Sequence, residues 1–237
     1  MSSSAVPRGF EGLRIAVISD LHGRDKLYAR LLEKTAAAKP DLIILPGDIS
    51  DREEQWDALE GLLEKLTDLA PCYYASGNHE WADLDAERFF RRLSEAGVTV
   101  LRNSWVTLER NGDTLVLAGL EDPNGYADMP SPEAVMARIR EETDDGVLVL
   151  CHRPGMFPRL AAAGYDLVFS GHNHGGLIRL PVLGGLFSSS GFHPEYDKGL
   201  FSLGDSEMLV SPGLTGSNGI PRFLNRPEVP VAVLHAS

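Results

Sequence analysis

The chain has few cysteines, a shortage of basic side chains and no long apolar run, and each shortage excludes a class of protein. Its two cysteines, Cys72 and Cys151, each lie at one end of an apolar run that predicts a buried strand. We therefore expect reduced core thiols and no disulfide framework. No run of about 18 or more apolar residues could span a bilayer, and residues 1–12 have no signal-peptide pattern. We expect a cytoplasmic chain, or a membrane-associated one if an anchor precedes it in the natural protein.

Acidic side chains outnumber basic ones by 34 to 22, which gives a formal net charge of −12. This charge works against attraction to nucleic-acid phosphates or to an anionic membrane surface and leaves room only for a local basic patch. We therefore expect no specific nucleic-acid binding. The 237 residues contain no internal repeat and no proline- or serine-rich linker. This composition predicts a single globular domain over residues 1–237, with residues 1–12 as a flexible N-terminal extension.

The first half of the chain alternates short apolar runs with amphipathic segments. Strands separated by helices of this length predict right-handed βαβ crossovers and a parallel sheet that is covered on both faces. The predicted strands are 14–19, 41–45 and 72–75, and the predicted helices are 26–38 and 56–69.

Later segments predict further strands and two hairpins. Asn111-Gly112-Asp113 and Gly204-Asp205 are turn sequences between strand-like runs. Together with the first half, they indicate an α/β protein with a mixed two-sheet sandwich and helices outside. The later strands are predicted at 98–102, 105–109, 114–118, 146–151, 166–171, 199–203, 207–210 and 229–234.

Polar side chains that can bind metals occur where the predicted strands end. The carboxyl ends of strands in an open α/β sheet border one crevice, so these residues should become neighbours. Carboxylate, amide and imidazole donors without a thiolate suit hard and borderline divalent cations, and the set is large enough for two ions. The glycines Gly47, Gly77 and Gly171 each precede a candidate and allow a close approach. The candidate ligands are Asp20, His22, Asp48, Asn78, His152, His172 and His174.

The order of these motifs resembles the calcineurin-like metallophosphoesterase superfamily, in its bacterial branch of small metal-dependent phosphoesterases. The resemblance implies a four-layer αββα sandwich of two mixed β-sheets flanked by helices, which is the metallo-dependent phosphatase fold. It covers nearly the whole chain, because the tail segments 211–214 and 221–223 are also similar. The motifs are Asp20-Leu21-His22, Gly47-Asp48, Gly77-Asn78-His79-Glu80, His152 and Gly171-His172-Asn173-His174.

The resemblance also implies a dinuclear metal centre and a reaction. Asp20, His22 and His174 would bind the first ion. Asn78, His152 and His172 would bind the second, and Asp48 would bridge both. A hydroxide shared by the ions would attack phosphorus in line and hydrolyse a phosphodiester or phosphomonoester, such as a lipid-linked or nucleotide pyrophosphate. Manganese is the first candidate for the ions, with iron, zinc or cobalt as alternatives.

Three further residues receive catalytic roles from the same resemblance. His79 resembles the family's catalytic histidine, which protonates the leaving oxygen or stabilises charge as imidazolium. Asp51 would orient it, and Arg52 is a secondary candidate for a phosphate clamp, because residues 47–52 partly match a stretch of the Ser/Thr protein phosphatases. Asp51 could equally be a helix N-cap, and Arg52 could be a solvated or ion-paired arginine.

Two other functions stay open at this stage. Residues 47–52 and 77–80 also fit an enzyme like the Ser/Thr protein phosphatases. A catalytically silent member of the fold could serve as a metal-binding interaction scaffold. The Gly/Ser-rich stretch 184–191 could form a substrate loop, although His193 beside it is typical of an ordinary surface histidine.

Overall fold

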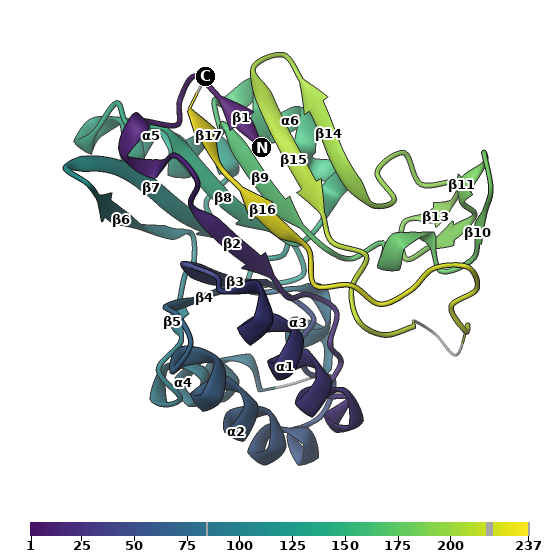
Figure 1. Ribbon diagram of the computed structural model, residues 1–237. Helices are drawn as coiled ribbons and strands as arrows, with labels where there is room; N and C mark the ends of the chain where they lie inside the picture. The colour runs from purple at the N-terminus through teal and green to yellow at the C-terminus, as the bar shows by residue number, and fades with distance from the viewer. Residues whose placement is uncertain (84, 217–219, 237) are drawn as a thin grey trace.

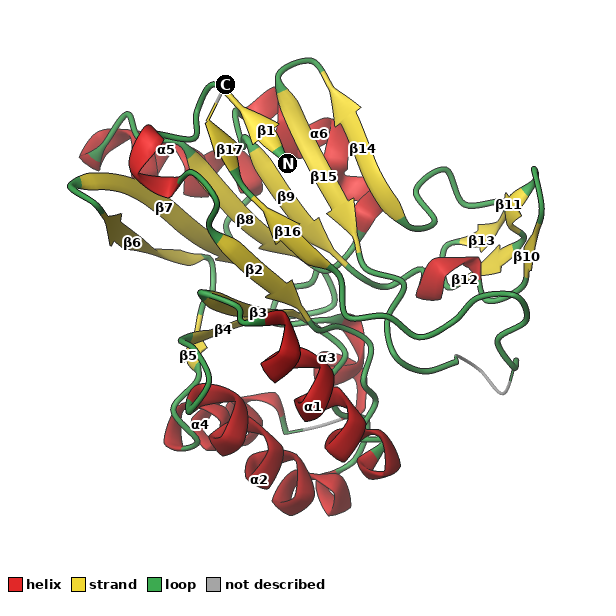
Figure 2. Cartoon of the chain, in the orientation of Figure 1, coloured by secondary structure: helices red, strands yellow, loops and turns green. Residues whose placement is uncertain are grey.

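The computed structural model of the protein describes residues 1–83, 85–216 and 220–236, and two mixed β-sheets dominate it (Figures 1 and 2). The first sheet has the strand order β16-β2-β3-β4-β5, in which β16 is antiparallel to β2 and the other pairs are parallel. Its strands are β2 (Arg14–Val17), β3 (Leu42–Pro46), β4 (Cys72–Ala75), β5 (Thr99–Val100) and β16 (Val231–Val233).

The second sheet has the order β14-β15-β9-β8-β7-β6, with a parallel centre and an antiparallel hairpin at each edge. The β6–β7 hairpin turns at Asn111 and Gly112, both of which have positive φ, as the sequence predicted. The strands are β6 (Ser104–Arg110), β7 (Asp113–Leu120), β8 (Val147–Cys151), β9 (Leu167–Ser170), β14 (Gly199–Leu203) and β15 (Ser206–Val210).

Helices cover the outer face of each sheet. Side chains from α1, α2 and α4 pack against the first sheet, and side chains from α5 and α6 pack against the second. None of the described helices is long and apolar enough to cross a bilayer. The α-helices are α1 (Tyr28–Ala38), α2 (Trp56–Thr67), α3 (Asn78–Asp83), α4 (Ala86–Glu95), α5 (Pro132–Glu142) and α6 (Phe157–Ala163), and short 3-10 turns are η1 (Arg8–Phe10), η2 (Asp25–Leu27), η3 (Glu53–Gln55), η4 (Pro154–Met156) and η5 (His174–Gly176).

Alternation along the buried strands creates the layers. In β3, Ile43 faces the helices while Ile44 packs between the two sheets. In β8, Val149 faces α5 and α6 while Leu148 and Leu150 pack between the sheets. Successive strand residues point to opposite faces, so a fully apolar strand can fill two cores at once. The four-layer αββα sandwich expected from the motifs is confirmed.

The N-terminal segment differs from the expectation of a flexible extension over residues 1–12. Strand β1 (Ser2–Ser3) pairs in parallel with β17 (His235–Ala236), and Val6 and Phe10 are buried between the sheets. Burial of these two apolar side chains stabilises the segment against the sandwich, which the polar start of the sequence did not reveal.

Both cysteines are free and buried, as predicted. Burial raises the pKa of the Cys72 and Cys151 thiols to about 12. They are therefore inert core side chains at neutral pH.

Besides β1 and β17, four short strands were not predicted. They form two antiparallel hairpins, β10–β11 and β12–β13, between η5 and β14. Each strand has two residues, which is too short for a periodic pattern. The bounds are β10 (Arg179–Leu180), β11 (Gly184–Gly185), β12 (Phe187–Ser188) and β13 (Gly191–Phe192).

Gly119 in β7 tests the contact between the two sheets. A Cβ at this position would overlap Leu101 and lie 3.2 Å from the Cβ of Ala75 in the first sheet. We expect Gly119→Ala to lower the free energy of unfolding by about 1–3 kcal/mol through overpacking, measured by urea denaturation.

Gly61→Ala is the matched control, because no atom lies within 4 Å of a Cβ at that position of α2. It should raise stability by about 0.5–1 kcal/mol, since alanine is the better helix former. Equal stability of Gly119→Ala and the wild type would contradict close sheet packing at β7.

Candidate metal centre

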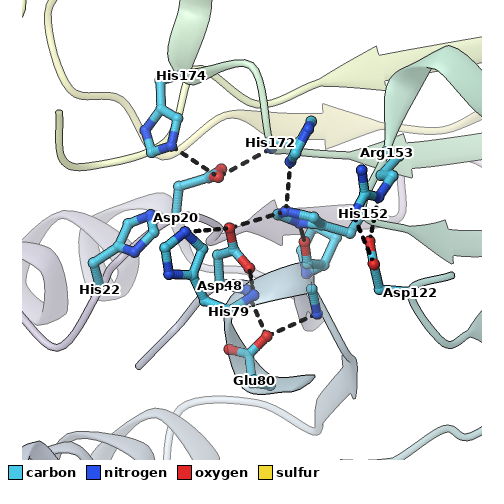
Figure 3. A network of polar contacts seen from close by, with 12 residues as sticks. Asp20, His22, Asp48, His79, Glu80, Asp122, His152, Arg153, His172 and His174 are labelled. Atoms are coloured by element: carbon cyan, nitrogen blue, oxygen red, sulfur yellow. Dashed lines mark hydrogen bonds and ion pairs between the residues drawn. The ribbon is translucent and has the colours of Figure 1, made fainter. Parts of the chain in front are cut away.

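Six of the seven predicted ligands, all except Asn78, meet where strands of the two sheets end (Figure 3). The first sheet supplies Asp20 and His22 after β2 and Asp48 after β3. The second sheet supplies His152 after β8 and the 172–174 segment after β9. Residues more than a hundred positions apart in the sequence therefore come together, as expected for the carboxyl ends of parallel strands.

The ligand atoms form two buried clusters. Asp20, His22 and His174 form the first, and Asp48, His152 and His172 form the second, with the atoms of each cluster within 4.8 Å of one another. In the first, His174 Nε2 lies 3.6 Å from Asp20 Oδ1. In the second, His152 Nε2 lies 3.1 Å from Asp48 Oδ2 and 3.2 Å from His172 Nδ1. The backbone N–H of His172 donates to Asp20 Oδ1 at 3.0 Å and so joins the clusters.

Three ligand atoms in this region are buried without a hydrogen-bond partner among the described residues. They are Asp20 Oδ2, His22 Nε2 and the side-chain oxygen of Asn78. Buried polar atoms are almost always paired, so each of these atoms needs an explanation. An oxygen, an imidazole nitrogen and an amide oxygen are all donors that divalent cations accept. The residues present therefore fit a metal.

The histidines are oriented by their second ring nitrogen. His152 Nδ1 lies 2.7 Å from the carbonyl of Pro46, and His174 Nδ1 lies 3.0 Å from the carbonyl of Thr215. In these contacts Nδ1 donates to a carbonyl, so Nε2 is the ring nitrogen that faces the cluster. Metal-binding histidines are held in this way in proteins, which makes the rings suitable ligands before any ion arrives.

The backbone of the site is itself unusual. Five of the candidate ligands have positive φ, between 48° and 68°, in the left-handed region that costs a non-glycine residue on the order of 1 kcal/mol. Such residues cluster at functional sites, where the surrounding structure holds them. The five are Asp20, His22, Asp48, His172 and His174.

Two glycines allow these turns to approach one another. A Cβ on Gly77 would overlap Asp48 Oδ1, and a Cβ on Gly171 would lie 2.5 Å from Asp20 Oδ2. The close approach that the sequence suggested at these positions is therefore present. Any side chain there would displace a candidate ligand.

His79 and Asp51 lie beside the first cluster. Asp51 Oδ1 is 3.1 Å from His79 Nδ1 and 2.5 Å from His22 Nδ1, so one carboxylate contacts both rings. The Gln55 side chain accepts hydrogen bonds from the backbone N–H groups of Asp51 and Arg52 at 2.8 and 2.9 Å. Arg52 itself is exposed, and its side chain enters none of the ion pairs among the described residues.

Charges within the site favour cations. Burial opposes the charge of His152, but the Asp48 carboxylate outweighs it and raises the pKa to about 10. The hydrogen bond with Asp51 raises the pKa of His79 to about 9, although burial acts in the opposite direction. Burial and then His152 lower the pKa of His172 to about 4, so that ring is neutral at pH 7. The carboxylates thus create a negative electrostatic potential in the site. The potential that stabilises a protonated histidine would also attract a divalent cation.

Glu80 supports the site in a way that the sequence did not reveal. Its buried carboxylate accepts hydrogen bonds from the backbone N–H groups of Gly77, Asp48 and Ile49 at 2.7, 3.0 and 2.7 Å. It therefore ties the turn after β3 to the turn after β4. Burial, followed by the nearby Asp48 carboxylate, raises the pKa of Glu80.

Arg153 and Asp122 were also missed. The Arg153 guanidinium forms a two-point pair with Asp122, at 2.6 and 2.9 Å, beside the His152 ring (Figure 3). Asp122 follows the carboxyl end of β7, so the strand-end rule that found the ligands could also have found it. Arg153 is one-third exposed and adds a fixed positive charge next to the second cluster.

Comparison with known proteins shows the family to which the chain is related. Residues 13–176 match the family model described as calcineurin-like phosphoesterase. The chain is 30% identical to the metallophosphoesterase YkuE of Bacillus subtilis, over 100% of this chain and 84% of that protein. It is 29% identical to the phosphodiesterase YaeI of Escherichia coli, over 91% of this chain and 80% of that protein. A transmembrane protein with metallophosphoesterase domain from Danio rerio is 30% identical over 97% of this chain, which spans 54% of that longer protein.

Solved structures share the fold at low sequence identity. TT1561 of Thermus thermophilus superimposes with a TM-score of 0.57 at 15% identity, over 85% of this chain and 89% of that chain. A dimetal phosphatase from Danio rerio superimposes with a TM-score of 0.55 at 11% identity, over 86% and 88% of the two chains. At these identities the likeness extends to the fold alone.

The hydrogen bonds of Glu80 generate a stability prediction. Glu80→Ala leaves three buried N–H groups without their acceptor, and we expect it to lower the free energy of unfolding by about 3 kcal/mol. Urea denaturation in the presence of EDTA measures this loss without a contribution from bound metal.

Glu141→Ala on the exposed face of α5 is the control and should change stability by less than about 0.5 kcal/mol. Equal stability of the Glu80 and Glu141 variants would show that the three hydrogen bonds do not hold the turns.

Proposed function

Because the chain belongs to the calcineurin-like phosphoesterase family, we propose that it is a dinuclear metal-dependent phosphoesterase that hydrolyses a phosphodiester or a phosphomonoester. The observation that carries the proposal is the pair of buried Asp/His clusters, together with three ligand atoms that have no partner in the described chain. A structural role alone leaves these atoms unexplained.

The proposed ligand sets combine the two clusters with the roles that the family resemblance gives Asn78 and Asp48. Asp20, His22 and His174 would hold one ion, and Asn78, His152 and His172 the other, with Asp48 shared between them. When bound, two divalent ions polarise a phosphoester and lower the pKa of water. Manganese is our first candidate, and iron, zinc and cobalt suit the same oxygen and imidazole donors.

His79 is the proposed proton donor to the leaving oxygen. Its ring is 29% exposed, so a substrate can reach it, and its Nε2 lies 3.9 Å from Asp48 Oδ2 at the edge of the second cluster. Asp51 holds Nδ1 and keeps the ring protonated at neutral pH. Arg52 is exposed at the same loop and is a secondary candidate for contact with the phosphate.

The substrate class is proposed only at the level of a small-molecule or lipid phosphoester. The relative YaeI is named a phosphodiesterase, which supports testing diesters first. A panel of aryl mono- and diesters, nucleotide-linked lipids and phosphopeptides would separate the proposal from an enzyme like the Ser/Thr protein phosphatases. If the protein binds two ions but hydrolyses none of these substrates, it would instead be a metal-binding scaffold.

Two substitutions should give two different phenotypes. Asp48→Ala removes the shared ligand, so metal content and hydrolysis of an aryl phosphate should both be lost. His79→Ala should retain both ions while its turnover falls by about a hundredfold or more, because only the proton donor is gone. Metal analysis by mass spectrometry and an aryl-phosphate assay measure the two properties.

His235→Ala is the histidine control, because that ring is exposed and pairs with Glu11 away from the clusters. It should keep both metal and turnover. Loss of an ion from His79→Ala would make His79 a ligand, and full activity of Asp48→Ala in metal-controlled buffer would overturn the mechanism.

Asp51 should set the alkaline limit of the reaction. Its carboxylate raises the pKa of His79, so the protonated ring persists as pH rises and is lost only near the raised value of about 9. Asp51→Asn removes this charge, and the pKa of His79 should fall toward its ordinary value of about 6.5. We expect the alkaline limb of the pH–rate profile to move down by about 1–2 pH units.

Asp57→Asn is the matched control, because Asp57 is exposed and pairs with Arg92 on the helical surface. Its pH–rate profile should be that of the wild type. Identical profiles for Asp51→Asn and the wild type, at equal metal content, would refute the role of Asp51.

A further inference from the structure

A small apolar extension lies beside the metal centre and outside the four layers. We call it the apolar prong and define it as residues 178–193, which contain the β10–β11 and β12–β13 hairpins, together with residues 220–224. Figures 1 and 2 show the hairpins at the right, clear of both sheets. The prong begins directly after η5, which contains the candidate ligand His174.

Most of the large apolar side chains that are exposed in the described chain lie here. Seven of the eleven large apolar side chains that are exposed lie in the prong. Val182 at the β10–β11 turn is fully exposed, and Leu183 beside it is 60% exposed. Single exposed apolar residues are ordinary, whereas a concentration of this kind marks an interaction surface. The seven are Val182, Leu183, Phe187, Phe192, Ile220, Phe223 and Leu224.

Hydrogen bonds hold the prong in this shape. The backbone of Phe223 donates to Leu177 at 3.0 Å and accepts from Arg179 at 3.0 Å, which joins the two segments of the prong. The Asp197 carboxylate accepts from the Arg179 guanidinium at 2.6 Å and from the Gly185 N–H at 2.8 Å. These hydrogen bonds therefore fix the backbone that carries the exposed apolar side chains at the turns.

The charge of the prong differs in sign from that of the whole chain, because residues 178–193 and 220–224 contain Arg179 and Arg222 and no aspartate or glutamate. Residues 167–194 and 208–227 contain no aspartate or glutamate, although the chain has 34 acidic residues and a net charge of −12. The same stretches contain Arg179, Arg222 and Arg226. Arg226 is exposed and enters none of the ion pairs among the described residues. Arg179 is paired with the Asp197 carboxylate at 2.6 Å, so the exposed Arg226 and the half-buried Arg222 are the arginines that complement an anionic lipid surface.

We propose that the apolar prong docks on anionic phospholipid bilayers, with its hairpin turns inserted among the lipid headgroups. A projecting turn with a fully exposed aliphatic side chain suits a deformable lipid interface, which needs no complementary cavity. A second copy of this chain would need a matching concave surface and would bring the same arginines toward each other. Its net charge of −12 would also oppose close pairing.

Docking would bring the metal centre near lipid headgroups. The Arg222 guanidinium donates to the Thr215 carbonyl at 2.7 Å, and that carbonyl also contacts His174 Nδ1 at 3.0 Å. The Asn225 side chain donates to the His174 carbonyl at 2.7 Å. The prong residue Arg222 and the candidate ligand His174 thus share one carbonyl, and Asn225, directly after the prong, bonds to His174 itself. This placement favours a phosphoester in the membrane as the substrate. The choice of substrate rests on the proposed phosphoesterase function, whereas the docking itself does not.

Vesicle flotation tests the docking without any turnover. The full chain should float with vesicles of equimolar phosphatidylcholine and phosphatidylglycerol and bind much less to pure phosphatidylcholine. The double substitution Val182→Ser/Leu183→Ser should reduce the bound fraction about tenfold, because two aliphatic side chains are lost from the interface. Arg226→Gln should weaken binding to the anionic vesicles only.

Leu200→Ser/Leu203→Ser on β14 is the matched control, because these leucines are 52% and 44% exposed on the sandwich. It should float like the wild type. Absence of wild-type flotation, or equal loss in both double variants, would overturn the proposal. The proposal would also be overturned if the wild type bound no lipid but self-associated in gel filtration, and if the Val182→Ser/Leu183→Ser variant no longer self-associated. An aryl-phosphate assay of the same proteins without vesicles reports separately on the proposed function.

Discussion

The site depends on the face-to-face packing of the two sheets. Neither sheet contains a complete ligand cluster: the first supplies Asp20 and Asp48, and the second supplies His152, His172 and His174. The apolar side chains between the sheets, such as Ile44, Leu148 and Leu150, set how the strand ends face each other. Protein interiors are close-packed and deform little, so this core transmits its geometry to the ligands. The burial of apolar side chains between the sheets thereby fixes the positions of the polar ligands at the strand ends.

The polar site is costly for the protein in the absence of a ligand. Left-handed backbone at five candidate ligands and unpartnered atoms on Asp20, His22 and Asn78 both oppose folding. Glu80 offsets part of this cost by satisfying three backbone N–H groups of the turns. Strain and unsatisfied polar atoms at one place are the usual mark of a site shaped for function.

The overall charge of the molecule and the charge of the prong point to different partners. A net charge of −12 describes the molecule, yet the prong contains no aspartate or glutamate and exposes seven large apolar side chains. The overall charge predicts repulsion from an anionic surface, whereas the local distribution favours contact through one end. Screening limits charge effects to about 10 Å at ordinary ionic strength, so the local pattern decides which contact forms.

The sequence by itself determined the layer architecture and the identity of the candidate ligands. Strand periodicity and turn residues are local properties, and the strand-end position of Asp20, Asp48 and His152 follows from topology. The grouping of the ligands and the pairing of Asp51 with His79 were expected from the family resemblance. Only the tertiary structure showed that Asp51 also contacts His22 and that Glu80 and the Arg153–Asp122 pair lie against the site. It also showed that residues 1–12 pack into the sandwich and that the prong projects from it. These features arise from contacts between distant segments, which no local pattern encodes.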